Sequence, residues 1–296
     1  MTKRSSKAME EFDIKTSYGA VHMYKKGTGE RTVFLLHGAG CDSAMLSWRE
    51  VMERFDDRYT VYAMDFLGYG KSEKPEGMCG EKFYPTHIAA VNEAVSFLKL
   101  DSFVLAGLSM GGAVAIGYAL KYPEKVEVLI PVDSWGLSKK LPFHRLSCFF
   151  IHKTDFTLIQ YRQLAKSRRL ARWCIAYSLI GDKSRITDEI TNEVLEACKG
   201  DMAGKSMQDY QRSSCGRTGA IPYYGDRLKK LGMPVIFVNG ERDSMVPVKD
   251  SEAASRLVPS GKLFILKGCK HWSVKERPEE FLEIIEKNVY RKEAMI

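Results

Sequence analysis

Short, continuous apolar runs recur along the chain and alternate with longer amphipathic stretches. Runs of this kind are typical of parallel strands that are buried on both faces. They occur at residues 20–24, 32–36, 60–66, 103–106, 126–132, 234–239 and 262–266. Apolar residues with helical spacing lie between or after them at 43–55, 85–100, 113–120 and 278–288. The alternation predicts an α/β fold in which helices flank a mostly parallel sheet.

The alternation stops after residue 136. Between 137 and 222 we find no convincing strand, but helical spacing occurs at 156–179, 187–198 and 202–214. Thr187 is a predicted N-cap because two acidic residues follow it. We therefore divide the chain into a first core part (1–134), a helical cap insertion (135–222) and a second core part (223–296). We expect the insertion to lie over the C-terminal edge of the sheet, where ligands bind in open α/β sheets.

Two groups of side chains in the insertion have more than one interpretation. Its aromatic residues either line an apolar pocket or hold the cap helices together. Its basic residues either receive a substrate carboxylate or form a solvated face, which we favour. The aromatic group is Trp135, Phe143, Phe149, Phe150 and Trp173, and the basic group is Arg162, Arg168, Arg169 and Arg172.

Composition narrows the class of protein. A chain of 296 residues with 45% hydrophobic residues can bury a sizeable core. No apolar run approaches the roughly 20 residues of a membrane span, and no apolar stretch follows the basic N-terminal residues as in a secretory signal, so we expect a soluble protein. The formal charge is +8, but both signs are mixed along the chain. This mixture favours a solvated basic surface over binding of nucleic acid or of an anionic substrate.

The seven cysteines are scattered and never form a Cys-x-x-Cys pair. We therefore expect neither a disulfide framework nor a zinc site, and a reducing cytoplasm is the simplest location.

The stretch from 102 to 122 contains the strongest chemical signal. An apolar strand leads into Gly107-Leu108-Ser109-Met110-Gly111, and a run of small helix-forming residues follows. In so tight a turn Ser109 adopts a strained backbone conformation, and glycines at 107 and 111 avoid collisions with neighbouring chain. The turn exposes one hydroxyl at the start of a helix, where N–H groups and the helix dipole favour negative charge. The pattern predicts a nucleophile elbow.

A serine nucleophile needs a base and usually a carboxylate that orients the base. Among the six histidines, His271 follows the last predicted strand, at the edge of the sheet where Ser109 emerges. Asp243 follows the preceding strand and is the predicted carboxylate. Asp133 is the rival, because it also ends a strand at this edge, whereas Glu241 is expected to face water.

Two further loops lie at the ends of predicted strands. Small residues in His37-Gly38-Ala39-Gly40 allow the backbone to approach a ligand, so an N–H group of this loop could face the Ser109 hydroxyl. Asp65 ends the third predicted strand. We expect it to accept hydrogen bonds from its loop rather than to act in catalysis.

Taken together, these motifs resemble the α/β-hydrolase superfamily over about residues 18–290. The matches are H-G-x-G at 37–40, D-x-x-G-x-G-x-S at 65–72, G-x-S-x-G-G at 107–112, G-x-x-D at 240–243, and His271. The resemblance implies an eight-stranded, mostly parallel sheet with a helical cap. It also implies Ser109 as nucleophile, Asp243 and His271 as its partners, and an oxyanion hole from the N–H groups of Ala39 and Met110.

Serine suits acyl transfer, so we expect a hydrolase that cleaves an ester or lactone of a small, largely apolar substrate. Asp is the nucleophile of the family's epoxide hydrolases and haloalkane dehalogenases, and Ser109 disfavours both. We expect Gly38, Gly40, Trp135 and Trp272 to contact the substrate. The reading needs no metal or organic cofactor, and we expect neither nucleic acid nor a membrane as a partner.

Two alternatives stay open. The pair His271-Trp272 is similar to that of serine-dependent C–C hydrolases that cleave ring-fission products. Those enzymes usually continue with proline and glycine after the first glycine loop, whereas Cys41 and Asp42 follow Gly40 here. Some proteins with this fold are receptors or scaffolds with little or no turnover.

Overall fold

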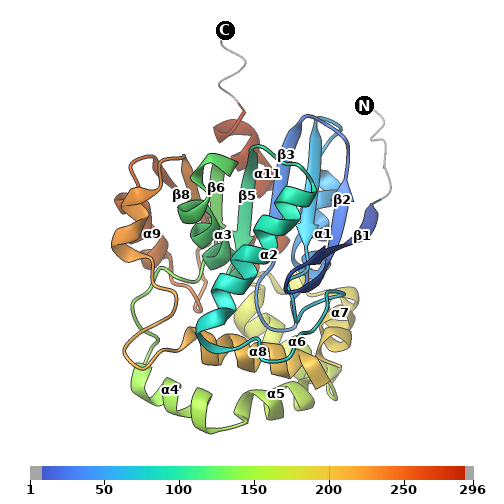
Figure 1. Cartoon of the computed structure of the whole chain (residues 1–296). Coiled ribbons are helices and arrows are strands. Elements are labelled where there is room, and N and C mark those ends of the chain that lie inside the picture. Colours follow the sequence, from blue (N-terminus) through green and yellow to red (C-terminus); the bar gives the residue numbers. More distant parts are fainter. Residues whose placement is uncertain (1–8, 200, 291–296) are drawn as a thin grey trace.

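The computed structural model describes residues 9–199 and 201–290 and has an eight-stranded sheet at its centre (Figure 1). The strand order is β1-β2-β4-β3-β5-β6-β7-β8. The pairs β1/β2 and β2/β4 are antiparallel, and the other neighbours are parallel, which confirms the predicted eight-stranded, mostly parallel sheet. The strands are β1 (Glu10–Thr16), β2 (Gly19–Lys26), β3 (Arg31–Leu36), β4 (Tyr59–Met64), β5 (Phe103–Leu108), β6 (Val126–Val132), β7 (Val235–Gly240) and β8 (Gly261–Leu266).

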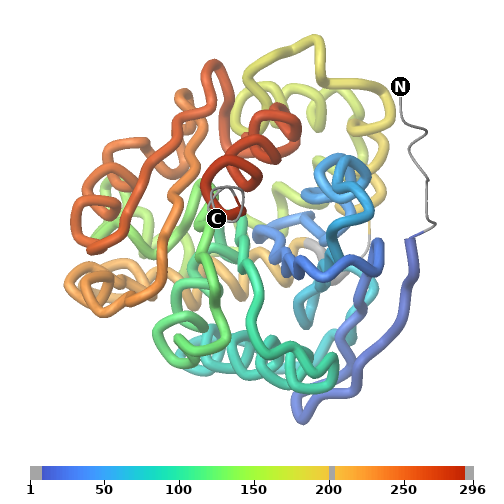
Figure 2. Tube along the Cα trace, turned by 90° about the horizontal axis from the view of Figure 1, so that it is seen from above, coloured from blue at the N-terminus to red at the C-terminus, as the bar shows by residue number. Residues whose placement is uncertain are grey.

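Helices cover both faces of the sheet, as the view from above in Figure 2 shows. The helices α2 and α3 pack together on one face, and α1 and α11 pack together on the other. Neighbouring side chains of one strand therefore enter two separate cores: Phe34 joins the first and Val33 the second. Burial on both faces explains why the strands are apolar throughout. The core helices are α1 (Ala44–Arg54), α2 (Phe83–Phe97), α3 (Met110–Lys121), α9 (Val248–Leu257), α10 (Ser273–Glu276) and α11 (Pro278–Asn288).

The seven predicted strands are confirmed as β2 to β8, and the four predicted core helices as α1, α2, α3 and α11, with shifts of a few residues at their ends. Trp48 of α1 is fully buried. The sequence reading missed α9 and β1. The strand β1 lies at the edge of the sheet and fully buries only Ile14, so it contains no apolar run.

The segment between β6 and β7 is helical, as predicted, and its helices gather at one end of the sheet (Figure 1). Thr187 is the N-cap of α7, because its side chain accepts a hydrogen bond from the N–H of Ile190. The predicted helical stretch 156–179 is helical but not continuous, because Ser167 caps a new helix in the middle of this range. No described helix has the length and apolarity to cross a bilayer. The helices are α4 (His144–Lys153), which we did not predict, α5 (Phe156–Leu164), α6 (Arg168–Cys174), the π-helical turn η3 (Ile175–Leu179), α7 (Asp188–Cys198) and α8 (Asp201–Ser214).

The expectation of no disulfide is wrong for one pair. Cys148 on α4 is bonded to Cys215, which directly follows α8. The two cysteines are 67 residues apart in the sequence and are brought together only by the packing of α4 against α8. This bond ties the middle of α4 to the residue that follows α8, the helix that separates α4 from the sheet.

Candidate active site

The chain turns at Ser109 from β5 directly into α3. Ser109 has φ 53° and ψ −114°, a strained conformation for a residue with a side chain. A Cβ atom at position 107 would lie 2.3 Å from the carbonyl oxygen of Gly111, and one at position 111 would lie 2.4 Å from that of His37. Only glycine fits at these two positions, so the sequence Gly-x-Ser-x-Gly is required by the close approach of three backbone segments.

His271 and Asp243 form a buried pair at the ends of β7 and β8. His271 Nδ1 lies 2.7 Å from Asp243 Oδ2. The other oxygen of Asp243 accepts hydrogen bonds from the N–H groups of Met245 (2.7 Å) and Val246 (3.0 Å). The carboxylate is therefore fixed by its own loop, and it can orient the imidazole so that Nε2 is the free nitrogen.

Asp133, the rival carboxylate, has other partners. Its Oδ1 accepts a hydrogen bond from the N–H of Gly240 (2.7 Å), and its Oδ2 accepts one from the hydroxyl of Ser273 (2.5 Å). Burial raises the pKa of Asp133 above the usual range, and the nearby charge of Asp243 adds to this rise. Asp133 thus joins the loops after β6, β7 and β8, whereas Asp243 holds the histidine.

The electrostatic environment favours protonation of His271. Burial by itself lowers the pKa of this imidazole, but the charge of Asp243 and the hydrogen bond to it act in the opposite direction. The charges of Asp133 and Asp42 add to their effect, and the pKa of His271 is raised above its ordinary value of 6.5. Such a base can accept a proton from a hydroxyl and hold it until a leaving group takes it.

The glycine loop after β3 lies against Ser109. A Cβ atom at position 38 would be 3.5 Å from the Cβ atom of Ser109. The N–H of Gly38 is bound by the carboxylate of Asp42 (2.7 Å), but the N–H groups of Ala39 and Met110 donate no hydrogen bond to any other residue in the described part of the chain. The two N–H groups predicted for the oxyanion hole are therefore unpaired, as such a hole requires.

Asp65 has the structural role that we expected. Its Oδ1 accepts a hydrogen bond from the N–H of Ala44 (2.7 Å), and its Oδ2 accepts one from the N–H of Lys71 (2.9 Å). This carboxylate therefore joins the start of α1 to the loop after β4. Glu241 is exposed, also as expected, and pairs with Lys267.

Ser109 and His271 line one cavity of about 270 Å³. Their side chains make no direct hydrogen bond in this structure, a separation that is common before a substrate binds. The walls are largely apolar and contain no lysine or arginine. The lining residues are Ser109, Trp135, Leu141, Pro142, Ile151, Met207, Tyr210, Gln211, Ser214, Cys215, Ser244, Met245, Val246 and His271.

Of the four residues that we predicted to contact substrate, only Trp135 lines the cavity of Ser109 and His271. Trp135 lines the cavity and donates a hydrogen bond from Nε1 to the carbonyl oxygen of Ile221 (2.9 Å). Trp272 does not line it: this ring is buried in the core with α1 and α11. Gly40 lines a different cavity of about 230 Å³. Gly38 is a neighbour of Ser109 and is absent from both linings.

Neither interpretation of the other insertion aromatics holds. Phe143, Phe149, Phe150 and Trp173 are exposed, so they neither line the cavity nor fill a cap core. The insertion arginines also lie on the surface, where Arg168 and Arg172 pair with Asp188, which agrees with the solvated face that we favoured.

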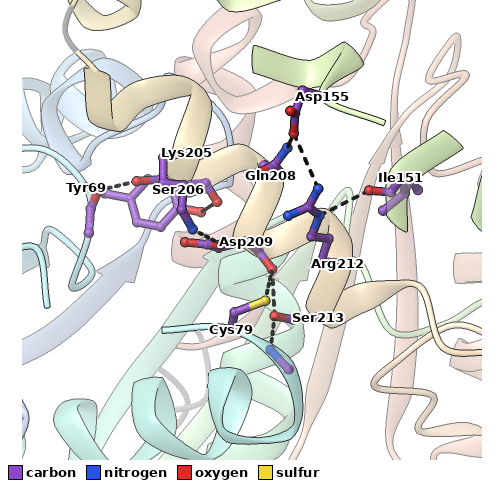
Figure 3. Close-up of polar contacts among 12 residues, drawn as sticks. Tyr69, Cys79, Ile151, Asp155, Lys205, Ser206, Gln208, Asp209, Arg212 and Ser213 are labelled. Atoms are coloured by element: carbon purple, nitrogen blue, oxygen red, sulfur yellow. Dashed lines mark hydrogen bonds and ion pairs between the residues drawn. The ribbon is translucent and has the colours of Figure 1, made fainter. Parts of the chain in front are cut away.

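The helix α8 forms one wall of the cavity, which the sequence reading did not detect. Met207, Tyr210 and Ser214 lie three or four residues apart and so face one side of the helix. Figure 3 shows how α8 is held between the core and the outer helices. On the core side the hydroxyl of Tyr69 binds the carbonyl oxygen of Ser206 (3.2 Å).

One group of side chains has the composition of a metal site. Potential ligand atoms of His144, Cys148 and Cys215 lie within 4.8 Å of one another. Because the two sulfur atoms are bonded to each other, neither is a thiolate available to an ion. The group therefore offers a metal only the imidazole of His144.

Comparisons with known proteins agree with the fold and show the family. Among solved structures, the fold is similar to that of a 2-hydroxy-6-oxo-6-phenylhexa-2,4-dienoate hydrolase from Rhodococcus sp. strain RHA1 (TM-score 0.77, 21% identity, 95% of this chain and 98% of that one). It is also similar to the carboxylesterase CesB from Bacillus subtilis (TM-score 0.72, 24% identity, 95% and 92%). In sequence, a 2-hydroxy-6-oxo-6-(2'-aminophenyl)hexa-2,4-dienoic acid hydrolase from Metapseudomonas resinovorans is 26% identical over 284 residues, 95% of this chain and 91% of that protein.

The family model for the alpha/beta hydrolase fold matches residues 31–278. The chain belongs to the alpha/beta hydrolase family.

Proposed function

We propose that this protein is a serine hydrolase that cleaves an ester or lactone of a small, largely apolar substrate through an acyl-enzyme. The observation that carries the proposal is the buried pair of His271 and Asp243, whose imidazole lines the same cavity as the strained Ser109. The segment 135–222 acts in this proposal as a cap that supplies much of the cavity wall.

The chemistry follows from these positions. Ser109 Oγ attacks the carbonyl carbon while His271 Nε2 takes the hydroxyl proton. The negative oxygen of the tetrahedral intermediate receives hydrogen bonds from the N–H groups of Ala39 and Met110. Collapse of the intermediate breaks the bond to the alkoxy group, which leaves with the proton from His271. Water, deprotonated by His271, then attacks the acyl-enzyme; the bond to Ser109 Oγ breaks, Oγ takes the proton from His271, and the acid is released.

The cavity wall supports an uncharged substrate. Burying a carboxylate requires a cation or several donors in a fixed arrangement. The lining has no lysine or arginine, and the surface arginines of the insertion do not reach it. Trp135, Met207 and Ile151 instead favour an apolar acyl or alkyl group.

A second candidate is hydrolysis of a C–C bond in a ring-fission diketone acid. It is favoured by the relatives whose names state dienoic acid substrates. The acid group of such a substrate finds no cation in the cavity wall, and the buried Trp272 does not line the cavity. We therefore rank it below ester hydrolysis. A ligand-binding role without turnover would not explain why His271 and Asp243 are paired beside Ser109.

Location in a reducing cytoplasm stays a prediction. The Cys148–Cys215 disulfide weighs against it, because disulfides persist mainly in oxidising compartments.

A substrate panel tests the proposal. We would compare p-nitrophenyl esters of increasing acyl length, lactones and dienone acids, with the Ser109→Ala variant as the blank. We expect serine-dependent turnover of uncharged esters or lactones. Turnover of dienone acids alone would replace the proposal by C–C hydrolysis, and no serine-dependent turnover of any of them would contradict both.

A further inference from the structure

An apolar stripe covers the outer side of α4 and α5. The described chain exposes fifteen large apolar side chains, and six of them lie within residues 143–159. On α4 they are spaced three or four residues apart, so they share one face of the helix. Phe143 is 85% exposed and Phe149 is 58% exposed. We call this set the outer stripe: Phe143, Leu146, Phe149, Phe150, Phe156 and Ile159.

The opposite side of these helices is already occupied. Cys148 on α4 is bonded to Cys215, and Arg212 of α8 donates a hydrogen bond to the carbonyl oxygen of Ile151 (3.2 Å). Gln208 of α8 donates to Asp155 (3.1 Å), at the start of α5 (Figure 3). Contacts to α8 therefore fix the rotation of both helices, with α4 and α5 as the outermost helices at this end of the molecule (Figure 1). The outer stripe has no room to turn inward.

Cations surround the outer stripe. Residues 139–166 contain six exposed basic residues and one acidic residue, Asp155, which already faces Arg212 at 3.6 Å. Within the described chain, Arg145, Lys153, Arg162 and Lys166 form no ion pair with an acidic residue. The six are Lys139, Lys140, Arg145, Lys153, Arg162 and Lys166.

We propose that the outer stripe of α4 and α5 docks onto an anionic lipid surface. Phenylalanine, leucine and isoleucine on one face with lysine and arginine beside them are the composition of helices that lie in the membrane interface. The basic residues would meet the anionic headgroups while the apolar side chains enter the acyl region. The proposal replaces the expectation from the sequence that no membrane is a partner. That expectation rested on the lack of an apolar run long enough to cross a bilayer, and docking in the plane of the interface needs no spanning helix.

Charge favours this partner over a second copy of the chain. A symmetric dimer through the same face would place both sets of cations opposite each other. Such like charges repel, and no acidic residue apart from Asp155 is available in this segment to compensate. An anionic lipid surface instead satisfies the apolar and the basic side chains together.

The docking surface adjoins the catalytic cavity. Three residues at α4 line the cavity. Leu141 and Pro142 precede the helix, and Ile151 lies on its inner side. The outer stripe and the cavity wall are thus two sides of one helix, so docking would bring the lipid surface within a helix diameter of the cavity.

Sedimentation with lipid vesicles tests the proposal. The full chain would be mixed with vesicles of phosphatidylcholine alone or with added phosphatidylglycerol. We expect binding at least about tenfold stronger to the anionic vesicles, and weaker binding as salt rises from about 0.1 to about 1 M, because the screening length shortens. The double substitution Phe149→Ser with Phe150→Ser should reduce binding at least about tenfold, since it removes two apolar side chains from the stripe.

Phe97→Ser is the matched control. Phe97 is 63% exposed at the end of α2, outside the outer stripe, and its substitution should leave vesicle binding unchanged. Equal thermal midpoints would show that all variants are folded. The proposal is overturned if wild-type protein does not bind anionic vesicles, or if the double variant binds them as tightly as the Phe97→Ser control. A dimer in sedimentation velocity that the double variant abolishes, without vesicle binding, would also overturn it and assign the face to self-association.

Discussion

Asp243 accepts a 2.7 Å hydrogen bond from Nδ1 of His271, and its second oxygen is held by two N–H groups of its own loop. The carboxylate therefore cannot turn away from the imidazole without losing three hydrogen bonds. A histidine held in one tautomer, with Nε2 free, is the part of the site on which the proposed acyl transfer depends.

The pH dependence of turnover should report His271. The base acts only in its neutral form, and its pKa is raised above 6.5 by the nearby carboxylates. We expect kcat/KM for a p-nitrophenyl ester to rise with pH through an apparent pKa above 6.5 and then to level off. An acid limb centred well below that value would contradict the assigned base.

Asp243→Asn should remove the orienting charge. We expect kcat/KM to fall by about 10⁴-fold, the loss expected when an orienting carboxylate becomes an amide. The pKa of His271 should also fall, so the remaining activity should persist to lower pH than in the wild type. Steady-state kinetics across pH measures both effects.

Asp133→Asn is the matched control for that substitution. The pKa of Asp133 is raised by burial, so an amide resembles its neutral form and can still accept a hydrogen bond from the N–H of Gly240. We expect kcat/KM within about tenfold of the wild type, since Asp133 makes no hydrogen bond to His271. A larger loss of kcat/KM for Asp133→Asn than for Asp243→Asn would mean that Asp133, and not Asp243, orients His271.

The sequence predicted the parts of the molecule in which local pattern and tertiary environment agree. The strands from β2 to β8 are buried on both faces, so their apolar runs are visible in the sequence. The elbow at Ser109 and the loop that contains Asp243 are short motifs of consecutive residues, so they can be recognised in the sequence.

The parts that the sequence did not reveal depend on contacts between distant segments. The edge strand β1 is mostly polar because it buries Ile14 alone. The bond between Cys148 and Cys215 depends on the packing of α4 against α8, and the cavity wall on α8 exists only after the insertion has folded against the core. The aromatic residues of α4 indicated burial, but the structure exposes them, because α8 occupies the position between α4 and the sheet.

Gly111→Ala should destabilise the elbow. A methyl group there would lie 2.4 Å from the carbonyl oxygen of His37, and that backbone cannot move without displacing β3. We expect the free energy of unfolding to fall by about 1–3 kcal/mol or the protein not to fold. Gly232→Ala is the matched control. No atom lies within 4 Å of a methyl group at position 232, so this substitution should change the free energy of unfolding by no more than about 0.5 kcal/mol. Equal effects in denaturant unfolding would argue against the close packing.

His87 should make the protein sensitive to acid. It is buried against Phe66 and Phe83, neither ring nitrogen has a hydrogen-bond partner, and burial lowers its pKa to about 3. Between this value and the ordinary 6.5, the unfolded chain binds one more proton than the folded chain, so stability falls as pH falls. From pH 7 to pH 5 this single group should cost about 2 kcal/mol.

His87→Leu should remove the part of the acid-induced loss of stability that comes from His87. The drop in the free energy of unfolding between pH 7 and pH 5 should be smaller in the variant than in the wild type by about 2 kcal/mol. Urea unfolding at the two pH values measures the difference. The same drop in both proteins would mean that His87 is protonated in the folded state.

Covalent labelling of Ser109 tests the central claim most directly. A fluorophosphonate reacts with a serine only where a base and an oxyanion hole activate it, so we expect one label per folded chain, located on Ser109 by mass spectrometry. Ser244→Ala, which alters another serine of the cavity wall, should label as the wild type does, and Ser109→Ala should not label. A folded wild-type protein that stays unlabelled, or equal labelling of Ser109→Ala, would contradict the account.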